Sequence, residues 1–188
     1  MRLKELKQKI LTPIFYTYQL EKLFDEPKSQ INTQLARMVK RGDLIRFKRG
    51  VFIFSGMQAD EFAVADCLFQ PSYISLESAL NSLGIMPDVF GQVTSITTVT
   101  SRVFTNNWGT FSYSKIDKKL YFGFERVEDE ESRGYYNMAL PEKALLDYLY
   151  IRRVRNLENQ RIDFGPIEKK RLSKFAEPYP GWVRKAVL

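Results

Sequence analysis

The stretch that decides the fold runs from Ser29 to Phe54 and reads SQINTQLARMVKRGDLIRFKRGVFIF. Apolar residues recur at helical spacing in its first half, which predicts an amphipathic helix that Ser29 caps and that ends near Arg41. Gly42 follows the helix as a terminating glycine commonly does. The apolar stripe consists of Ile31, Leu35, Met38 and Val39.

Two short runs of β-type residues, 44–47 and 51–54, follow this helix. They are joined through Lys48, Arg49 and Gly50, where the glycine can adopt the positive φ of a tight hairpin. A helix followed by a hairpin with a basic tip is the order of a winged helix-turn-helix. In that arrangement the helix enters the major groove of DNA and the hairpin forms the wing.

The polar face of the predicted helix supplies the candidate DNA-binding residues. Short polar side chains can reach base edges, so we expect Asn32, Thr33 and Gln34 to read sequence. On the wing, Arg46, Lys48 and Arg49 are expected to contact phosphate. The complete helix set is Ser29, Gln30, Asn32, Thr33, Gln34, Arg37, Lys40 and Arg41. An ordinary solvated helix face, followed by a hairpin whose cations protect its edge, explains the same local pattern.

The charge distribution favours the DNA-binding interpretation. The 188-residue chain has a net charge of +7, and residues 1–56 alone carry 12 Lys and Arg against 5 Asp and Glu. Residues 57–151 have a net charge of −6 and residues 152–188 a net charge of +6. Because phosphate attracts local positive charge, a basic N-terminal unit beside an acidic middle indicates nucleic-acid binding more strongly than the total does.

The preceding residues complete a helix-turn-helix. Residues 3–10 predict a short first helix that ends before Pro13, and residues 17–24 predict a second helix that Thr17 caps. A polar seam at 55–58 divides the chain into a winged helix-turn-helix domain, 1–56, and a second domain, 57–188. The predicted fold class is α+β, with a mixed α/β second domain that has a small antiparallel sheet and flanking helices.

The second domain is predicted to begin with a helix over 60–69 and another that Ser75 caps and Gly84 ends. Strands over 93–103, 110–113 and 120–124 predict an antiparallel meander, and a last strand covers 135–140. Pro141 then opens a strong helix in which Leu145, Leu149 and either Leu146 or Tyr148 pack inward. Further helices are predicted over 167–175 and 182–188 within a basic tail.

Catalytic motifs are scarce in the sequence. The chain has no histidine, and its single cysteine, Cys67, lies in an apolar helical pattern that indicates a buried thiol. We therefore expect no catalytic residue, no metal site and no cofactor. Carboxylate chemistry stays open, but Asp117-Lys118 lies in a predicted turn and Glu142-Lys143 in a predicted helix. The acidic run over 128–131 is interpreted as a solvated loop.

The middle of the chain resembles the AbiEi family, the antitoxins and transcriptional regulators of type IV toxin-antitoxin systems. The motifs that carry this resemblance are the Leu83-Gly84 helix end, the Thr-rich run 93–100, Gly109-Thr110-Phe111, the wing-like Arg49-Gly50-Val51-Phe52, and PEKALLD over 141–147. Their order covers about residues 29–150. Many relatives have an arginine-rich stretch after the Thr-rich strand, whereas residues 102–107 here read RVFTNN.

The resemblance implies an autorepressor that binds double-stranded operator DNA and opposes a nucleotidyltransferase-like toxin, with or without a stable complex. Two other functions stay open: a metal-dependent nuclease with a winged-helix targeting module, and a winged helix used only for protein contacts. Trp108 and Tyr113 are candidate anchors of a protein interface, although filling the core is the better interpretation of such aromatics. We expect a cytoplasmic protein without a membrane partner.

Overall fold

The computed structural model describes residues 1–88, 91–129, 134–158 and 160–187. These residues form a mixed α+β protein with eight α-helices, a small antiparallel sheet and a larger mixed sheet. The chain divides into two compact units, Met1–Val64 with Glu128–Tyr135, and Ala65–Val127 with Tyr136–Leu188. The domain boundary at 56/57 stays a prediction. Within the described residues, no helix has the length and apolar character needed to cross a membrane.

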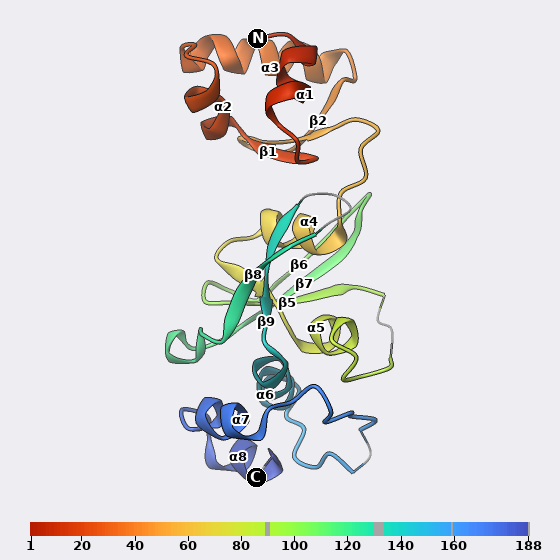
Figure 1. The fold of residues 1–188 in the computed structure, drawn as a ribbon, viewed down its shortest axis with the longest axis vertical. Coiled ribbons are helices and arrows are strands. Elements are labelled where there is room, and N and C mark those ends of the chain that lie inside the picture. Colours follow the sequence, from red (N-terminus) through yellow and green to blue (C-terminus); the bar gives the residue numbers. More distant parts are fainter. Residues whose placement is uncertain (89–90, 130–133, 159, 188) are drawn as a thin grey trace. The chain divides into compact units, whose positions relative to one another are not determined.

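The first unit packs helices on one side of a three-stranded antiparallel sheet (Figure 1). Its elements are α1 (Leu3–Lys9), β1 (Ile14–Tyr16), α2 (Thr17–Leu23), α3 (Lys28–Lys40), β2 (Leu44–Lys48) and β3 (Val51–Phe54), and the strand order is β1-β3-β2. The core is mainly apolar, and it includes Leu6, Phe15, Leu20, Ile31, Leu35, Leu44 and Phe54. The three predicted helices and the hairpin are confirmed, whereas β1 was not predicted.

Two predicted helix caps in this unit are wrong. Ser29 is the second residue of α3, whose N-cap position is Pro27, and the Ser29 carbonyl accepts a hydrogen bond from the Thr33 hydroxyl (2.9 Å). Thr17 is the first residue of α2 rather than its cap, because its hydroxyl donates instead to the Gly50 carbonyl (3.3 Å). In both cases the residue lies inside the helix, where its polar groups have tertiary or intrahelical partners.

The second unit contains a six-stranded mixed sheet with the order β6-β7-β5-β4-β9-β8. After α4 (Glu61–Leu68), its elements are β4 (Ser72–Ile74), α5 (Leu76–Ser82), β5 (Val93–Thr97), β6 (Arg102–Asn106), β7 (Gly109–Lys115), a 3-10 turn (Lys118–Leu120), β8 (Phe124–Glu128), β9 (Tyr135–Ala139), α6 (Pro141–Arg152), α7 (Lys169–Ala176) and α8 (Gly181–Val187). The predicted helices and the last strand are confirmed, and β4 and β8 were missed. Glu128, predicted to lie in a solvated loop, is the last residue of β8. Residues 130 and 131 of the acidic run and residue 188 of the last predicted helix lie outside the described residues.

The predicted antiparallel meander is wrong. Residues 93–103 do not form one strand, because the chain leaves the sheet between Thr97 and Arg102. The β6–β7 hairpin then folds back so that β7 pairs with β5 in parallel, which leaves β6 at an edge. Residues 120–124 are not a strand either: Gly123 has a φ of +72°, and β8 begins after it. Strand propensity identified most of these residues, but it does not specify which strands become neighbours.

Helix α6 is enclosed on all sides. Residues 142–149 are all buried, so Leu145 and Leu149 pack inward as predicted, and both Leu146 and Tyr148 do so as well. Pro141 occupies the first turn, and Arg153 ends the helix in the left-handed conformation with a φ of +57°. A helix in this position places even its charged residues inside the unit.

Candidate functional site

The outer face of α3 presents most of the residues predicted to contact DNA. Ile31 and Leu35 are fully buried and Met38 is nearly so, which fixes the rotation of the helix about its axis. As a consequence, seven of the eight predicted polar and basic positions are exposed to solvent. The exposed residues are Ser29, Gln30, Asn32, Thr33, Arg37, Lys40 and Arg41, whereas Gln34 is half-buried.

The three predicted base-reading residues differ in how free they are. Gln34 donates from its amide nitrogen to a carboxylate oxygen of Glu26 (2.7 Å), in the turn before α3. The Thr33 hydroxyl donates to the Ser29 carbonyl (2.9 Å). Asn32 is exposed on the same helix. The geometry therefore leaves Asn32 as the residue best able to present its amide to a base edge, while Gln34 first has to release Glu26.

A shallow hollow of about 370 Å³ lies along this face of α3. Its lining consists of Ser29, Gln30, Thr33, Gln34 and Arg37, so the structure brings five of the predicted residues together. The side-chain carbonyl oxygen of Gln34 is buried and has no hydrogen-bond partner among the described residues. A buried acceptor of this kind is stabilised when a donor reaches it, as the exocyclic amino group of a base can do.

The β2–β3 hairpin carries the second group of predicted contacts. Arg46 and Arg49 are exposed and Lys48 is half-buried, and the register of the two strands shifts between Arg46 and Lys48. At the turn, Gly50 adopts a φ of +77° and its carbonyl accepts the Thr17 amide (2.9 Å). This bond ties the tip of the hairpin to the start of α2. The hydrogen bond between Thr17 and Gly50 thus stabilises the hairpin that carries the three cations.

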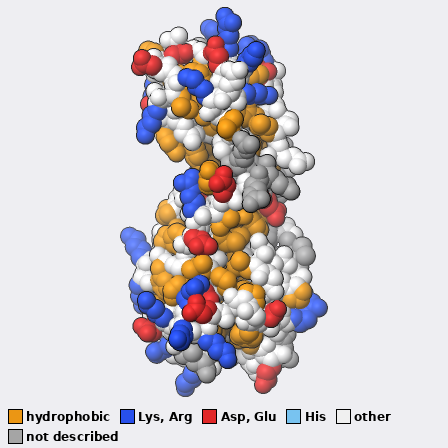
Figure 2. All heavy atoms as spheres, in the orientation of Figure 1, with side chains coloured by type: hydrophobic (Ala, Val, Ile, Leu, Met, Phe, Trp, Pro, Cys, Tyr) orange, Lys and Arg blue, Asp and Glu red, His pale blue; other side chains and the backbone are white. Residues whose placement is uncertain are grey.

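Positive charge is distributed around this unit rather than confined to the hairpin. Figure 2 shows Lys and Arg side chains standing out on the visible face of the part of the chain that contains α1, α2 and α3. Arg41 is partly neutralised, because its guanidinium pairs with Asp43 (2.8 Å) just after α3. We therefore expect Arg37 and Lys40 to contribute more than Arg41 to the attraction of phosphate.

The second unit contains a buried ionic cluster that the sequence did not predict. The Lys143 ammonium pairs with Asp147 one turn later on α6, and both side chains are fully buried. Lys143 also donates to the Tyr179 hydroxyl (2.6 Å), which in turn donates to Asp147 (2.7 Å). The second carboxylate oxygen of Asp147 accepts the hydroxyls of Tyr73 and Ser75, each at 2.9 Å. Four donors from separate parts of the unit converge on one carboxylate.

Burial sets the protonation of this cluster. Desolvation lowers the pKa of Lys143 from its ordinary value, and the adjacent Asp147 carboxylate opposes that change. Desolvation also raises the pKa of Tyr73 and of Tyr179, and the negative charge of Asp147 adds to the rise. Both phenols therefore stay protonated at neutral pH and remain donors. The Lys143 ammonium also lies 5.2 Å from the ring centres of Phe122 and Tyr179 and 5.6 Å from that of Tyr73.

A second buried carboxylate connects α6 to the segment that follows it. Glu142 is fully buried and accepts the backbone amide of Glu168 (2.7 Å), while Arg171 on α7 lies 3.6 Å from its other oxygen. Gly123 packs against the same region, since a β-carbon there would lie 2.9 Å from the Phe175 ring and 3.2 Å from Lys143. These contacts hold the C-terminal helices against α6.

The cluster contains residue types that are common in catalytic sites, but its side chains are not accessible to a substrate. Lys143, Asp147, Tyr73 and Ser75 have no exposed surface, and Tyr179 is only 2% exposed. No substrate can approach such groups in this conformation, so the arrangement acts as a structural anchor. One signal in the sequence could have revealed it: Lys143 and Asp147 stand four residues apart in a run that is otherwise mostly apolar.

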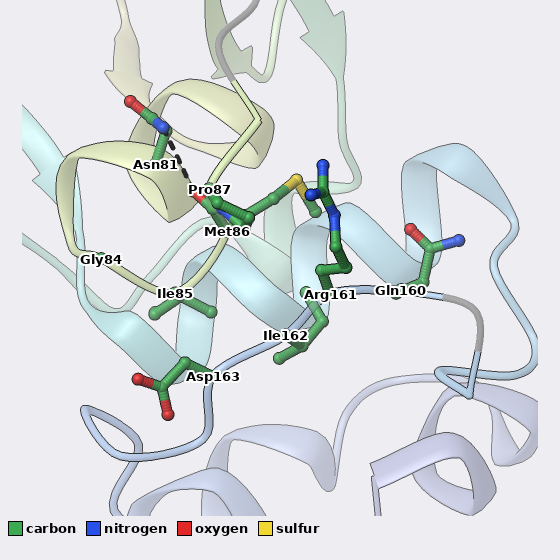
Figure 3. Close-up of a pocket in the computed structure, with 9 residues that line it drawn as sticks. All are labelled: Asn81, Gly84, Ile85, Met86, Pro87, Gln160, Arg161, Ile162 and Asp163. Carbon is green, nitrogen blue, oxygen red and sulfur yellow. Dashed lines mark hydrogen bonds between the residues drawn. The ribbon is translucent and has the colours of Figure 1, made fainter.

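An open hollow of about 730 Å³ lies beside the end of α5, where residues 84–87 face residues 160–163 (Figure 3). Several polar side chains that line the hollow form hydrogen bonds or ion pairs with other residues of the chain. Asn81 donates to the Met86 carbonyl (3.1 Å), Arg161 pairs with Asp88, and Gln160 accepts the Tyr148 hydroxyl (2.9 Å). Because these groups already have partners, we assign the hollow no ligand.

The remaining sequence predictions concern the second unit. Tyr113 is not an exposed interface anchor: it is 1% exposed, and its hydroxyl donates to the Ala65 carbonyl (2.6 Å). Cys67 is a buried thiol that forms no disulfide, as predicted. Among the residues that the structure describes, no group of three or more Asp, Glu or Cys side chains is arranged to hold a metal ion. Trp108 is half-buried at the β6–β7 turn.

Comparison with known proteins gives no assignment. No protein-family model matches the chain, and no curated protein matches it either.

The buried ion pair generates a stability prediction. We expect Lys143→Met or Asp147→Leu alone to lower the free energy of unfolding by about 3 to 5 kcal/mol, because each leaves an uncompensated buried charge. The double variant should cost less than the sum of the two single changes, since it removes both charges together. Urea unfolding of the three variants measures this. Additive losses would show that the two groups do not interact as the geometry indicates.

Proposed function

We propose that the protein is a DNA-binding transcriptional repressor whose first unit is a winged helix-turn-helix. The observation that carries this proposal is the placement of α3 and the β2–β3 hairpin on one core. The buried Ile31, Leu35 and Met38 turn the polar face of α3 outward, and the hairpin presents Arg46 and Arg49 nearby in the chain. A helix with short polar residues fits the major groove, and basic residues on a wing meet phosphate.

We further propose that the repressor acts as the antitoxin of a type IV toxin-antitoxin system and opposes a nucleotidyltransferase-like toxin encoded beside it. This half of the proposal rests on the family resemblance of residues 29–150. The motif residues have defined positions in the fold: Leu83-Gly84 ends α5, and PEKALLD begins the buried helix α6. Lys143 and Asp147 of that motif serve the internal anchor, so we assign the antitoxin contact to other, exposed residues of the second unit.

The wing is tested by charge reversal. The triple variant Arg46→Glu, Lys48→Glu and Arg49→Glu should weaken binding to all DNA sequences. It should also make the salt dependence shallower, by about 0.9 in the slope of log K against log salt for each phosphate that the wing no longer neutralises. The matched control reverses three exposed cations outside the hairpin, Lys115, Lys118 and Lys119, and should leave the slope unchanged. A folded wing variant with unaltered affinity would remove the hairpin from the interface.

Sequence reading is tested on α3. Asn32→Ala should reduce discrimination between operator and random DNA by about 1 to 3 kcal/mol while sparing nonspecific affinity. Gln34→Ala should have a smaller effect, because Gln34 is already bound to Glu26. Lys40→Ala serves as the contrasting control and should weaken binding to both DNAs alike. Competition titrations with the two duplexes measure the ratio, and equal losses for Asn32→Ala on both would indicate that α3 grips only the backbone.

The antitoxin half is tested with the whole chain. The wing charge-reversal variant, expressed from an unrelated promoter together with the adjacent toxin gene, should restore growth as well as the unaltered protein does while failing to repress its own promoter. Growth on induction, at equal protein levels, is the measurement. Loss of rescue would tie antitoxin activity to DNA binding. Incubating the protein with DNA and Mg²⁺ addresses the nuclease alternative, which metal-dependent cleavage abolished by one Asp or Glu substitution would support.

A further inference from the structure

The two edges of the six-stranded sheet differ in how they are protected. The strand order places β6 at one edge and β8 at the other. An edge strand presents a row of unpaired N–H and C=O groups, and proteins usually block such a row with charged residues, proline or a bulge. One edge of this sheet follows that rule, and the other does not.

The β8 edge is blocked by charge. Its sequence is FERVE, in which Glu125, Arg126 and Glu128 are all exposed. If two copies of this strand paired antiparallel about its centre, Arg126 would lie opposite Arg126 of the second copy. Like charges directly across a ladder are destabilising, so β8 resists pairing with itself.

The β6 edge has no comparable block. Its sequence is RVFTN, with one charged residue, no proline, and an unbroken register against β7 from Arg102 to Asn106. The Arg102 guanidinium lies 5.9 Å and 5.7 Å from the ring centres of Phe69 and Phe104 in the same molecule. The Arg102 charge thus lies against aromatic rings of its own molecule. Val103 is 61% exposed, more than any other large apolar side chain among the described residues, and Thr105 is exposed on the same strand.

We propose that β6 pairs antiparallel with β6 of a second copy of this chain, about a two-fold axis at Phe104. In this register Val103 lies opposite Thr105 of the second copy, and Arg102 lies opposite Asn106. No like charges face each other, and the two β-branched pairs cover the exposed Val103 surface. Alternate residues of β6 bond β7, so the residues between them direct their backbone groups to the open side and bond the second copy.

This interface is small. Five residues per copy bury less than the roughly 1,200 Å² that marks a stable association, so the dimer forms through a weak, reversible equilibrium at high protein concentration. The two-fold symmetry makes the contact isologous and self-limiting: each copy uses its one β6 edge, and the charged β8 edges end the combined sheet. The β6 contact does not depend on DNA binding.

Sedimentation equilibrium of the whole chain, from about 10 μM to about 1 mM, tests the dimer. The unaltered protein should shift from monomer to dimer across this range, and Val103→Lys should remain monomeric because it adds a charge to the edge. Val99→Lys is the matched control: Val99 is 47% exposed but lies outside β6, so this variant should dimerise normally. A monomer at the highest concentration, or a dimer that Val103→Lys leaves intact, overturns the proposal.

The register is tested by disulfide formation between different variants. An equal mixture of Val103→Cys and Thr105→Cys proteins should form a heterodimeric disulfide under mild oxidation, because opposed residues in the ladder bring their α-carbons to about 5.5 Å or less. Each variant alone should cross-link several-fold less, and this also controls for the buried Cys67. Equal cross-linking in all three samples, or none in the mixture, would place the contact elsewhere and overturn this pairing.

Discussion

The second unit depends on one desolvated ion pair. Lys143 and Asp147 are fully buried, and such a pair is tolerated only when further hydrogen bonds occupy its remaining donor and acceptor positions. Tyr73, Ser75 and Tyr179 provide those bonds, and they come from β4, from the residue before α5, and from the loop between α7 and α8. The sheet, α6 and the C-terminal helices must therefore all be in place before the charges are satisfied. This requirement makes the arrangement of the unit specific.

The first unit, by contrast, is stabilised mainly by apolar burial. Its core is mainly apolar, and each fully buried side chain such as Ile31 or Leu35 contributes about 1.5 to 3 kcal/mol by leaving water. Because Asn32 and Arg37 are exposed on the outer face of α3, substituting either one should leave this core intact. A few polar contacts do reach this face. The hydrogen bond from Gln34 to Glu26, for example, restricts the Gln34 side chain.

Local sequence patterns predicted which segments form helices and strands better than they predicted which strands pair with each other. The spacing of Ile31, Leu35 and Met38 indicated both the existence of α3 and its buried side, because helical amphipathicity is a local property. By contrast, the parallel pairing of β5 with β7 depends on how the chain crosses between residues 97 and 102, and strand propensity carries no information on that crossing. The short strands β1 and β4 have three residues each, too few to show an alternating pattern.

The candidate sites show the same difference between what local sequence predicts and what only the tertiary fold determines. The exposure of Arg46 and Arg49 on the hairpin agrees with the sequence analysis, since arginine side chains are mostly exposed, whereas Lys48 is half-buried. The Lys143–Asp147 cluster was not predicted, because the hydrogen-bond donors to Asp147 lie up to 74 residues away in the sequence and only the tertiary fold brings them together. The sequence nevertheless contained a conflict at this point, two opposite charges within an apolar helix. A buried charge without a partner is unstable, so such a conflict itself predicts that distant donors converge on it.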